Sequence, residues 1–130
     1  MAENRKTLKP TDAELEILSV LWEHGPSTVR FVNDQLNERR EVGYTTTLKF
    51  LQIMREKGLV SRNTEGRTHI YEAALSQHQV QEQLINKLVD TAFGGSAQKL
   101  VMQALGRSKS SKEELEAIKA YIKKLEGGKS

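Results

Sequence analysis

The chain has 130 residues and no cysteine, which excludes disulfide bonds, thiolate metal sites and cysteine nucleophiles. Aromatic residues make up only 5% of the sequence and apolar residues 37%, a low share for a self-sufficient core. No apolar run is long enough to span a bilayer, and residues 1–10 lack the apolar stretch of a secretion signal. We therefore expect a cytoplasmic protein whose buried surface is completed by a second copy.

The excess of basic over acidic side chains is also small in this sequence. The net charge is +3, and basic and acidic side chains are equal in number within residues 1–72. The whole excess therefore lies in residues 73–130. If the N-terminal half binds nucleic acid, it must do so through locally placed cations rather than through an overall positive field.

Groupings of catalytic or metal-binding residues are missing as well. His24, His69 and His78 show no spacing typical of a metal site. The segment Gly94-Gly95-Ser96 lacks the remaining residues of a phosphate loop or a nucleophile turn, and it is typical of a helix-breaking turn followed by a serine cap. We expect no enzymatic activity, no metal and no cofactor.

The first half of the chain carries the signals of two short helices. Thr11 and Glu14 have the spacing of a capping box, and Gly25-Pro26 ends the first helix. Ser27 is predicted to cap a second helix over residues 28–38, where apolar residues recur at helical spacing.

A third helix is predicted from Tyr44 to Gly58, a glycine well suited to end it. Leu51 and Met54 lie on its apolar face. The opposite face is polar and carries Thr45, Lys49, Gln52 and Glu56. This helix can therefore bury one side and present polar and cationic groups on the other.

Two alternating runs, residues 59–62 and 67–72, follow this helix and predict a β-hairpin with its turn at residues 64–66. Three helices followed by a hairpin are typical of a winged helix-turn-helix domain, which we expect over residues 8–74. In such domains the third helix enters the major groove of DNA and the hairpin lies along the neighbouring backbone. The predicted DNA-binding residues are Tyr44, Thr45, Thr46, Lys49, Gln52, Arg62 and Arg67.

The second half reads as three further helices. Ser76 caps the first, Gly106 is predicted to end the second, and Ser111 with Glu114 caps the third after a polar linker at residues 107–110. Their apolar stripes are too short to be stable alone, so we expect residues 76–126 to form a helical dimerisation region. The predicted dimerisation residues are Leu84, Leu88, Leu100, Val101, Ala104, Leu105, Leu115, Ile118, Ile122 and Leu125.

Two other interpretations are compatible with this pattern. The exposed threonines and arginines of a small α+β domain can serve solubility alone. A winged helix can also act as a protein-interaction adaptor without sequence-specific DNA binding, in which case Leu48 and Ile53 would form an apolar contact patch.

Several short segments occur in a characteristic order over roughly residues 8–126. They are Thr11–Leu18 with Leu21-Trp22, Gly43–Leu48 through Leu51, Glu56–Val60, Gly66-Arg67 with Tyr71, and Gly94-Gly95 with Leu100-Val101. Together they resemble the penicillinase repressor (BlaI/MecI) family of winged-helix regulators. The resemblance implies a homodimeric transcriptional repressor that binds double-stranded DNA at a palindromic operator. It also implies release through a membrane-bound metallopeptidase sensor.

The chain departs from this family at identifiable positions. The pair cleaved on induction in penicillinase repressors is Asn-Phe, and the matching residues here are Gln103 and Ala104. Position 48, often basic in the family, is Leu48, and Ile53 adds a second apolar group, so the operator sequence cannot be transferred. One branch of the family senses copper through C-terminal cysteines, and their absence here excludes that response.

Overall fold

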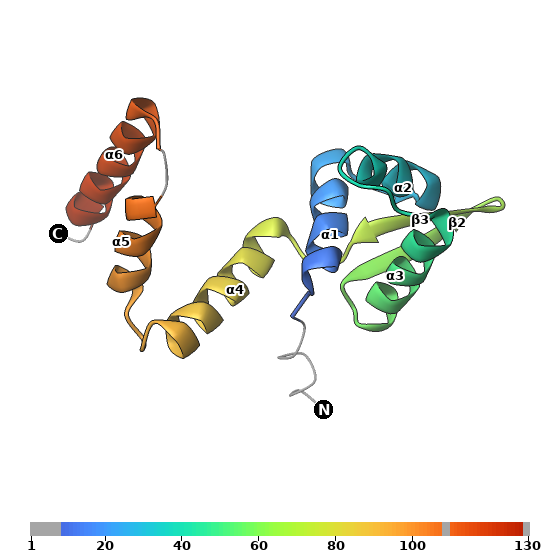
Figure 1. The fold of residues 1–130 in the computed structure, drawn as a ribbon, viewed down its shortest axis with the longest axis horizontal. Helices are drawn as coiled ribbons and strands as arrows, with labels where there is room; N and C mark the ends of the chain where they lie inside the picture. Colours follow the sequence, from blue (N-terminus) through green and yellow to red (C-terminus); the bar gives the residue numbers. More distant parts are fainter. Residues whose placement is uncertain (1–8, 108–109, 129–130) are drawn as a thin grey trace. The chain divides into compact units, whose positions relative to one another are not determined.

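The computed structural model describes residues 9–107 and 110–128, which form two compact units with their boundary between Ile85 and Asn86 (Figure 1). Residue 8, where the winged helix is predicted to begin, lies outside the described residues, and so does the middle of the predicted linker, residues 108–109. The elements in chain order are α1 (Asp12–His24), β1 (Ser27–Thr28), α2 (Val29–Asn37), α3 (Tyr44–Glu56), β2 (Val60–Glu65), β3 (Thr68–Ala73), α4 (Gln77–Ala92), α5 (Ala97–Arg107) and α6 (Lys112–Gly128).

The beginnings of α1 and α2 are set by side-chain caps. Glu14 N donates to Thr11 Oγ1 over 3.2 Å and Thr11 N donates to Glu14 Oε1 over 2.9 Å, so the predicted capping box is confirmed. The predicted cap of α2 is wrong by one residue. Thr28 caps this helix by accepting from Phe31 N over 3.1 Å, whereas Ser27 donates to the Gly25 carbonyl over 2.8 Å.

The sheet has the strand order β1-β3-β2, and both pairs are antiparallel. The hairpin is confirmed, but its turn is tighter than predicted. Glu65 pairs with Thr68, which leaves Gly66-Arg67 as the turn, and Gly66 has a φ of 61° that favours glycine. The third strand, β1, was not predicted; Ser27 pairs there with Tyr71.

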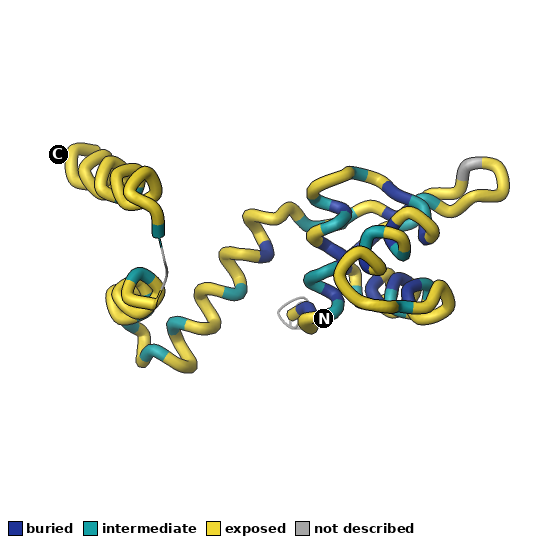
Figure 2. Tube along the Cα trace, turned by 45° about the horizontal axis from the view of Figure 1, so that its top comes forward, coloured by how far each residue is buried: buried dark blue, intermediate teal, exposed yellow. Residues whose placement is uncertain are grey.

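The core of the first unit lies between α1, α2, α3 and the sheet, where Figure 2 shows the buried residues gathered. Its fully buried side chains include Leu18, Val32, Leu51, Met54, Leu59 and Tyr71. Trp22 Nε1 donates to the Leu75 carbonyl over 2.9 Å and so ties α1 to the segment after β3. The core thereby fixes α3 and the hairpin in one rigid frame.

In the single chain, helices α5 and α6 contain no buried residue (Figure 2). Gly94 and Gly95, both with positive φ, end the preceding helix, and Ser96 caps α5 by accepting from Lys99 N over 3.1 Å. Gly106 does not end α5 as predicted, because the helix continues to Arg107. The capping box of Ser111 and Glu114 is confirmed, with both hydrogen bonds at 3.0 Å.

Within the described residues, none of the helices combines the length and the apolar character needed to cross a membrane.

Candidate nucleic-acid interface

Helix α3 is divided sharply between a buried and an exposed face. Thr47, Leu51 and Met54 have 0% exposure and point into the core. The predicted DNA-binding residues of this helix all lie outside the core and are exposed: Tyr44, Thr45, Thr46, Lys49 and Gln52. All five residues are therefore accessible, and Thr45, Thr46, Lys49 and Gln52 lie on the side of α3 opposite its buried residues.

The turn before α3 is held by two asparagine side chains. Asn33 Nδ2 donates to the Val42 carbonyl over 3.0 Å and to Thr47 Oγ1 over 2.8 Å. Asn37 donates to the same carbonyl over 2.8 Å and accepts from Val42 N over 3.1 Å. These bonds satisfy the buried Thr47 hydroxyl and fix the start of α3 against α2.

A partly buried ion pair holds the other end of α3. Lys57 Nζ donates to Glu14 Oε1 over 2.8 Å, and the Glu14 side chain is only 4% exposed. Lys57 directly follows α3, and Glu14 lies in the first turn of α1. The two ends of α3 are thus anchored to two different helices, which pre-organises its exposed face for binding.

The two hairpin arginines lie in different environments. Arg67 is exposed within the turn itself, whereas Arg62 is half-buried in β2 opposite Tyr71. Three residues of extended chain, about 10 Å, lie between Arg62 and the end of β2. If both arginines contact DNA, they contact different points of the backbone.

Arg30 is an exposed cation beside α3 that the sequence analysis did not single out. Its guanidinium carbon lies 5.6 Å from the centroid of the Tyr44 ring, a cation–π arrangement that joins α2 to the start of α3. The apolar spacing of α2 drew attention to its buried face alone. The available signal was the position of Arg30 beside the cap of a helix that precedes the predicted recognition helix.

The two apolar residues of the adaptor interpretation have different environments. Leu48 is half-buried and packs against the hydrophobic core, whereas Ile53 is 40% exposed. They do not form a single exposed patch. Ile53 instead lines a depression of about 190 Å³ on the outer side of α3 together with Thr45, Thr46, Lys49 and Phe50.

Comparison with known proteins identifies the family. The family model described as penicillinase repressor matches residues 10–124. The chain belongs to the penicillinase repressor family. A transcriptional regulator BlaI from Mycobacterium tuberculosis is 29% identical over 119 residues, covering 90% of this chain and 85% of that protein. A penicillinase repressor from Bacillus licheniformis is 23% identical over 114 residues, covering 88% of this chain and 89% of that protein.

Solved structures show the same fold. A MarR family protein from Bacillus stearothermophilus matches with a TM-score of 0.54 at 19% identity, covering 98% of this chain and 80% of that one. The predicted family and the predicted winged helix-turn-helix fold are both confirmed. This member of the penicillinase repressor family is a DNA-binding transcriptional repressor, not an enzyme.

The predicted dimerisation residues of this repressor lie on α4, α5 and α6 with much of their apolar surface accessible. Half-buried positions are Leu84, Leu100, Leu105 and Ile118. Exposed positions are Leu88, Val101, Ala104, Leu115, Ile122 and Leu125.

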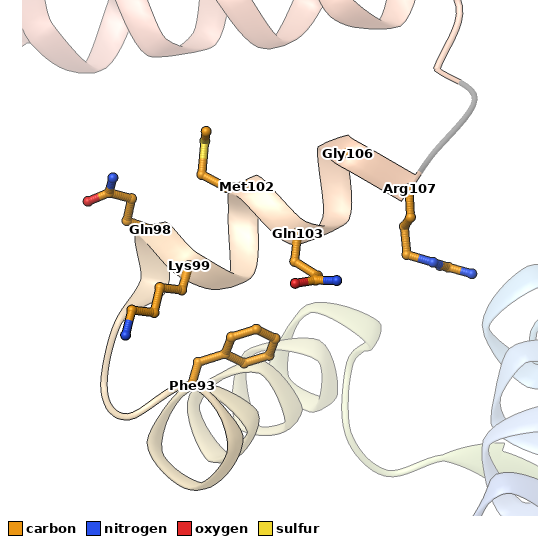
Figure 3. Close-up of a pocket in the computed structure, with 7 residues that line it drawn as sticks. All are labelled: Phe93, Gln98, Lys99, Met102, Gln103, Gly106 and Arg107. Atoms are coloured by element: carbon orange, nitrogen blue, oxygen red, sulfur yellow. The ribbon is translucent and has the colours of Figure 1, made fainter.

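The residues that match the family's cleavage pair lie in the middle of α5. Gln103 and Ala104 are both exposed in the single chain. Figure 3 shows Gln103 and Phe93 facing each other across the depression beside α5, whereas Met102 points away from Phe93.

Proposed function

We propose that this repressor acts as a homodimer on a palindromic operator, with α3 of each copy in the major groove and the hairpin beside the backbone. Thr45, Thr46 and Gln52 contact base edges or position the helix on phosphates, and Lys49 contacts a phosphate. Arg62 and Arg67 contact the backbone. The dimer binds in the cytoplasm, where the chromosomal operator is.

The observation that carries the proposal is the one-sided burial of α3. Three of its residues are completely buried, while the polar residues one turn apart on the other side are exposed. A helix that only completed the core would not need to be anchored at both ends. It would also not need an exposed face of threonine, lysine and glutamine. Such a face suits the major groove, where base edges offer hydrogen-bond donors and acceptors.

The homodimer is supported by the apolar surface of the C-terminal helices. Leu115, Ile122 and Leu125 recur at spacings of seven and three along α6 and are 41–48% exposed. An apolar stripe of this kind on a helix without buried residues is stable only when it packs against a partner. A second copy supplies the matching stripe, and its two-fold symmetry requires two operator half-sites in inverted orientation.

Release from DNA, in this proposal, is triggered by a membrane-bound metallopeptidase sensor or by a related signal, and Gln103 with Ala104 in α5 is the candidate cleavage region. Gln103 and Ala104 lie between the winged helix and α6 in the chain. A cut there would separate α6 from the DNA-binding unit and so weaken the dimer. A single half-site buries too little surface for tight binding at physiological salt, so repression would end.

Binding of the purified full-length chain to DNA that spans its own promoter tests the proposal. The titration is repeated at several salt concentrations and with an excess of unrelated DNA. We expect footprints on two half-sites about one helical turn apart, or a multiple of that spacing, which survive the competitor. Binding no tighter than to the competitor, at the promoter and in a selection from random DNA, would contradict the proposal.

A further inference from the structure

The outer side of α3 carries an apolar group that hydrogen bonding to bases does not explain. Ile53 is 40% exposed, in contrast to the fully buried Leu51 and Met54 of the same helix. It lines a depression of about 190 Å³ with the half-buried ring of Phe50, and the other lining residues are Thr45, Thr46 and Lys49. The two threonines each add a methyl group to this surface.

We propose that Ile53 and Phe50 form a specificity pocket for the 5-methyl group of thymine in each operator half-site. This inference rests on the proposed function, since it assumes that α3 enters the major groove. The major-groove edges of the bases present hydrogen-bond donors and acceptors, and their largest apolar group is that methyl. An isoleucine pressed against a donor or acceptor would desolvate that polar group without giving it a partner.

The charge beside the pocket favours DNA as its occupant over the apolar helix of a partner protein. Lys49 lines the same depression, and an apolar protein surface laid over it would have to bury or displace that cation. On DNA, Lys49 lies beside phosphates or acceptor atoms while Ile53 contacts the methyl group. The pocket therefore offers a cation for phosphate or acceptor oxygens and an apolar surface for the methyl group of thymine.

The test begins with selection of duplexes from a random-sequence library by the full-length protein. Each thymine of the enriched half-site is then replaced by uracil, which removes only the 5-methyl group. We expect the affinity to fall about fourfold at one or two positions, the effect of exposing one buried methyl, and to stay unchanged at the others.

The residue is assigned by combining the base change with a side-chain change. In Ile53→Ser, thymine and uracil at the sensitive position should bind equally well. Gln52→Ala is the matched control, because Gln52 is exposed on the same helix but does not line the pocket. It should weaken binding by the same factor on both DNAs and so keep the fourfold preference. Thermal melting of each variant confirms that it is folded.

The outcomes separate the two proposals. Failure to enrich any sequence contradicts the proposed function itself. An enriched operator that tolerates uracil everywhere overturns only the thymine pocket, and so does a preference for thymine that survives in Ile53→Ser.

Discussion

At the scale of single residues, Lys49 is where binding to phosphate can be measured directly. We expect Lys49→Ala to weaken operator binding and to reduce the slope of log affinity against log salt by about 0.9, the effect of one lost phosphate contact. Lys9→Ala removes the same charge from an exposed position outside α3 and the hairpin, and it should leave the slope unchanged. An identical slope for wild type and Lys49→Ala would remove Lys49 from the phosphate contacts.

Arg30 is the residue-scale prediction that only the structure provides. Its guanidinium stacks on Tyr44 at the start of α3, which places a cation next to the proposed DNA surface. Arg30→Ala should lower the salt slope by about one phosphate contact. Arg30→Lys keeps the charge but loses the planar stacking, so it should retain the slope and bind several-fold more weakly.

Tyr44 supplies the second half of that test. Tyr44→Phe retains the aromatic ring under Arg30 and should retain most of the affinity. Tyr44→Ala removes the ring and should lower the affinity. If Arg30→Ala binds DNA as wild type does at every salt concentration, Arg30 contributes to the packing of α2 against α3 and not to binding.

At the scale of elements, the turn between α2 and α3 depends on Asn33. Asn33→Ala removes two hydrogen bonds and leaves the fully buried Thr47 hydroxyl without its donor. We expect a loss of about 2 kcal/mol in the free energy of unfolding by urea, because an unsatisfied buried polar group costs about that much. Asp34→Ala, at the exposed neighbouring position, is the control and should stay within about 0.5 kcal/mol of wild type.

The same substitution should also weaken DNA binding under conditions where the variant remains folded, because the start of α3 is no longer held in place. Equal stability of Asn33→Ala and wild type would mean that water replaces the side chain in the turn. In that case the position of α3 would depend on the ion pair of Lys57 with Glu14 and on core packing.

Elements set by local chemistry were predictable from the sequence, and those set by tertiary pairing were not. The capping boxes at Thr11 and Ser111 follow from residues three apart, and the structure confirms both. Strand β1 has only two residues and exists because Ser27 and Thr28 pair with β3. No alternation is detectable over two residues, and a serine before a helix looks like a cap.

The candidate site shows the same division. The exposed face of α3 was predictable from the sequence, because residues on the same face of a helix recur every three or four positions. The contact between Arg30 and Tyr44 joins two helices, so no spacing within either helix predicts it. The opposite environments of Leu48 and Ile53 likewise depend on which neighbours cover each side of α3.

At the scale of the whole molecule, the two units have different roles in the proposed dimer: the winged helix contacts DNA, and the C-terminal helices raise the affinity by joining two copies. The winged helix has a packed core of its own, whereas α5 and α6 have no buried residue in the single chain. The proposed dimer therefore stabilises the C-terminal helices and at the same time links two weak half-site contacts. Linked sites bind far more tightly than either alone because the second contact becomes intramolecular.

The double substitution Ile122→Glu with Leu125→Glu tests this division in the full-length chain. Both side chains are 48% exposed on α6, so the changes cost the single chain little, but they place charges in the proposed dimer interface. Light scattering should show the 14.7 kDa monomer in place of a species of twice that mass. Binding to a full operator should fall at least a hundredfold, toward the affinity for a half-site.

Glu116→Gln with Lys119→Gln, exposed polar positions on the same helix, is the control and should remain dimeric. A charged double variant that is still dimeric would move the interface away from α6, and a monomer that binds the operator at wild-type affinity would show that dimerisation is not needed for DNA binding.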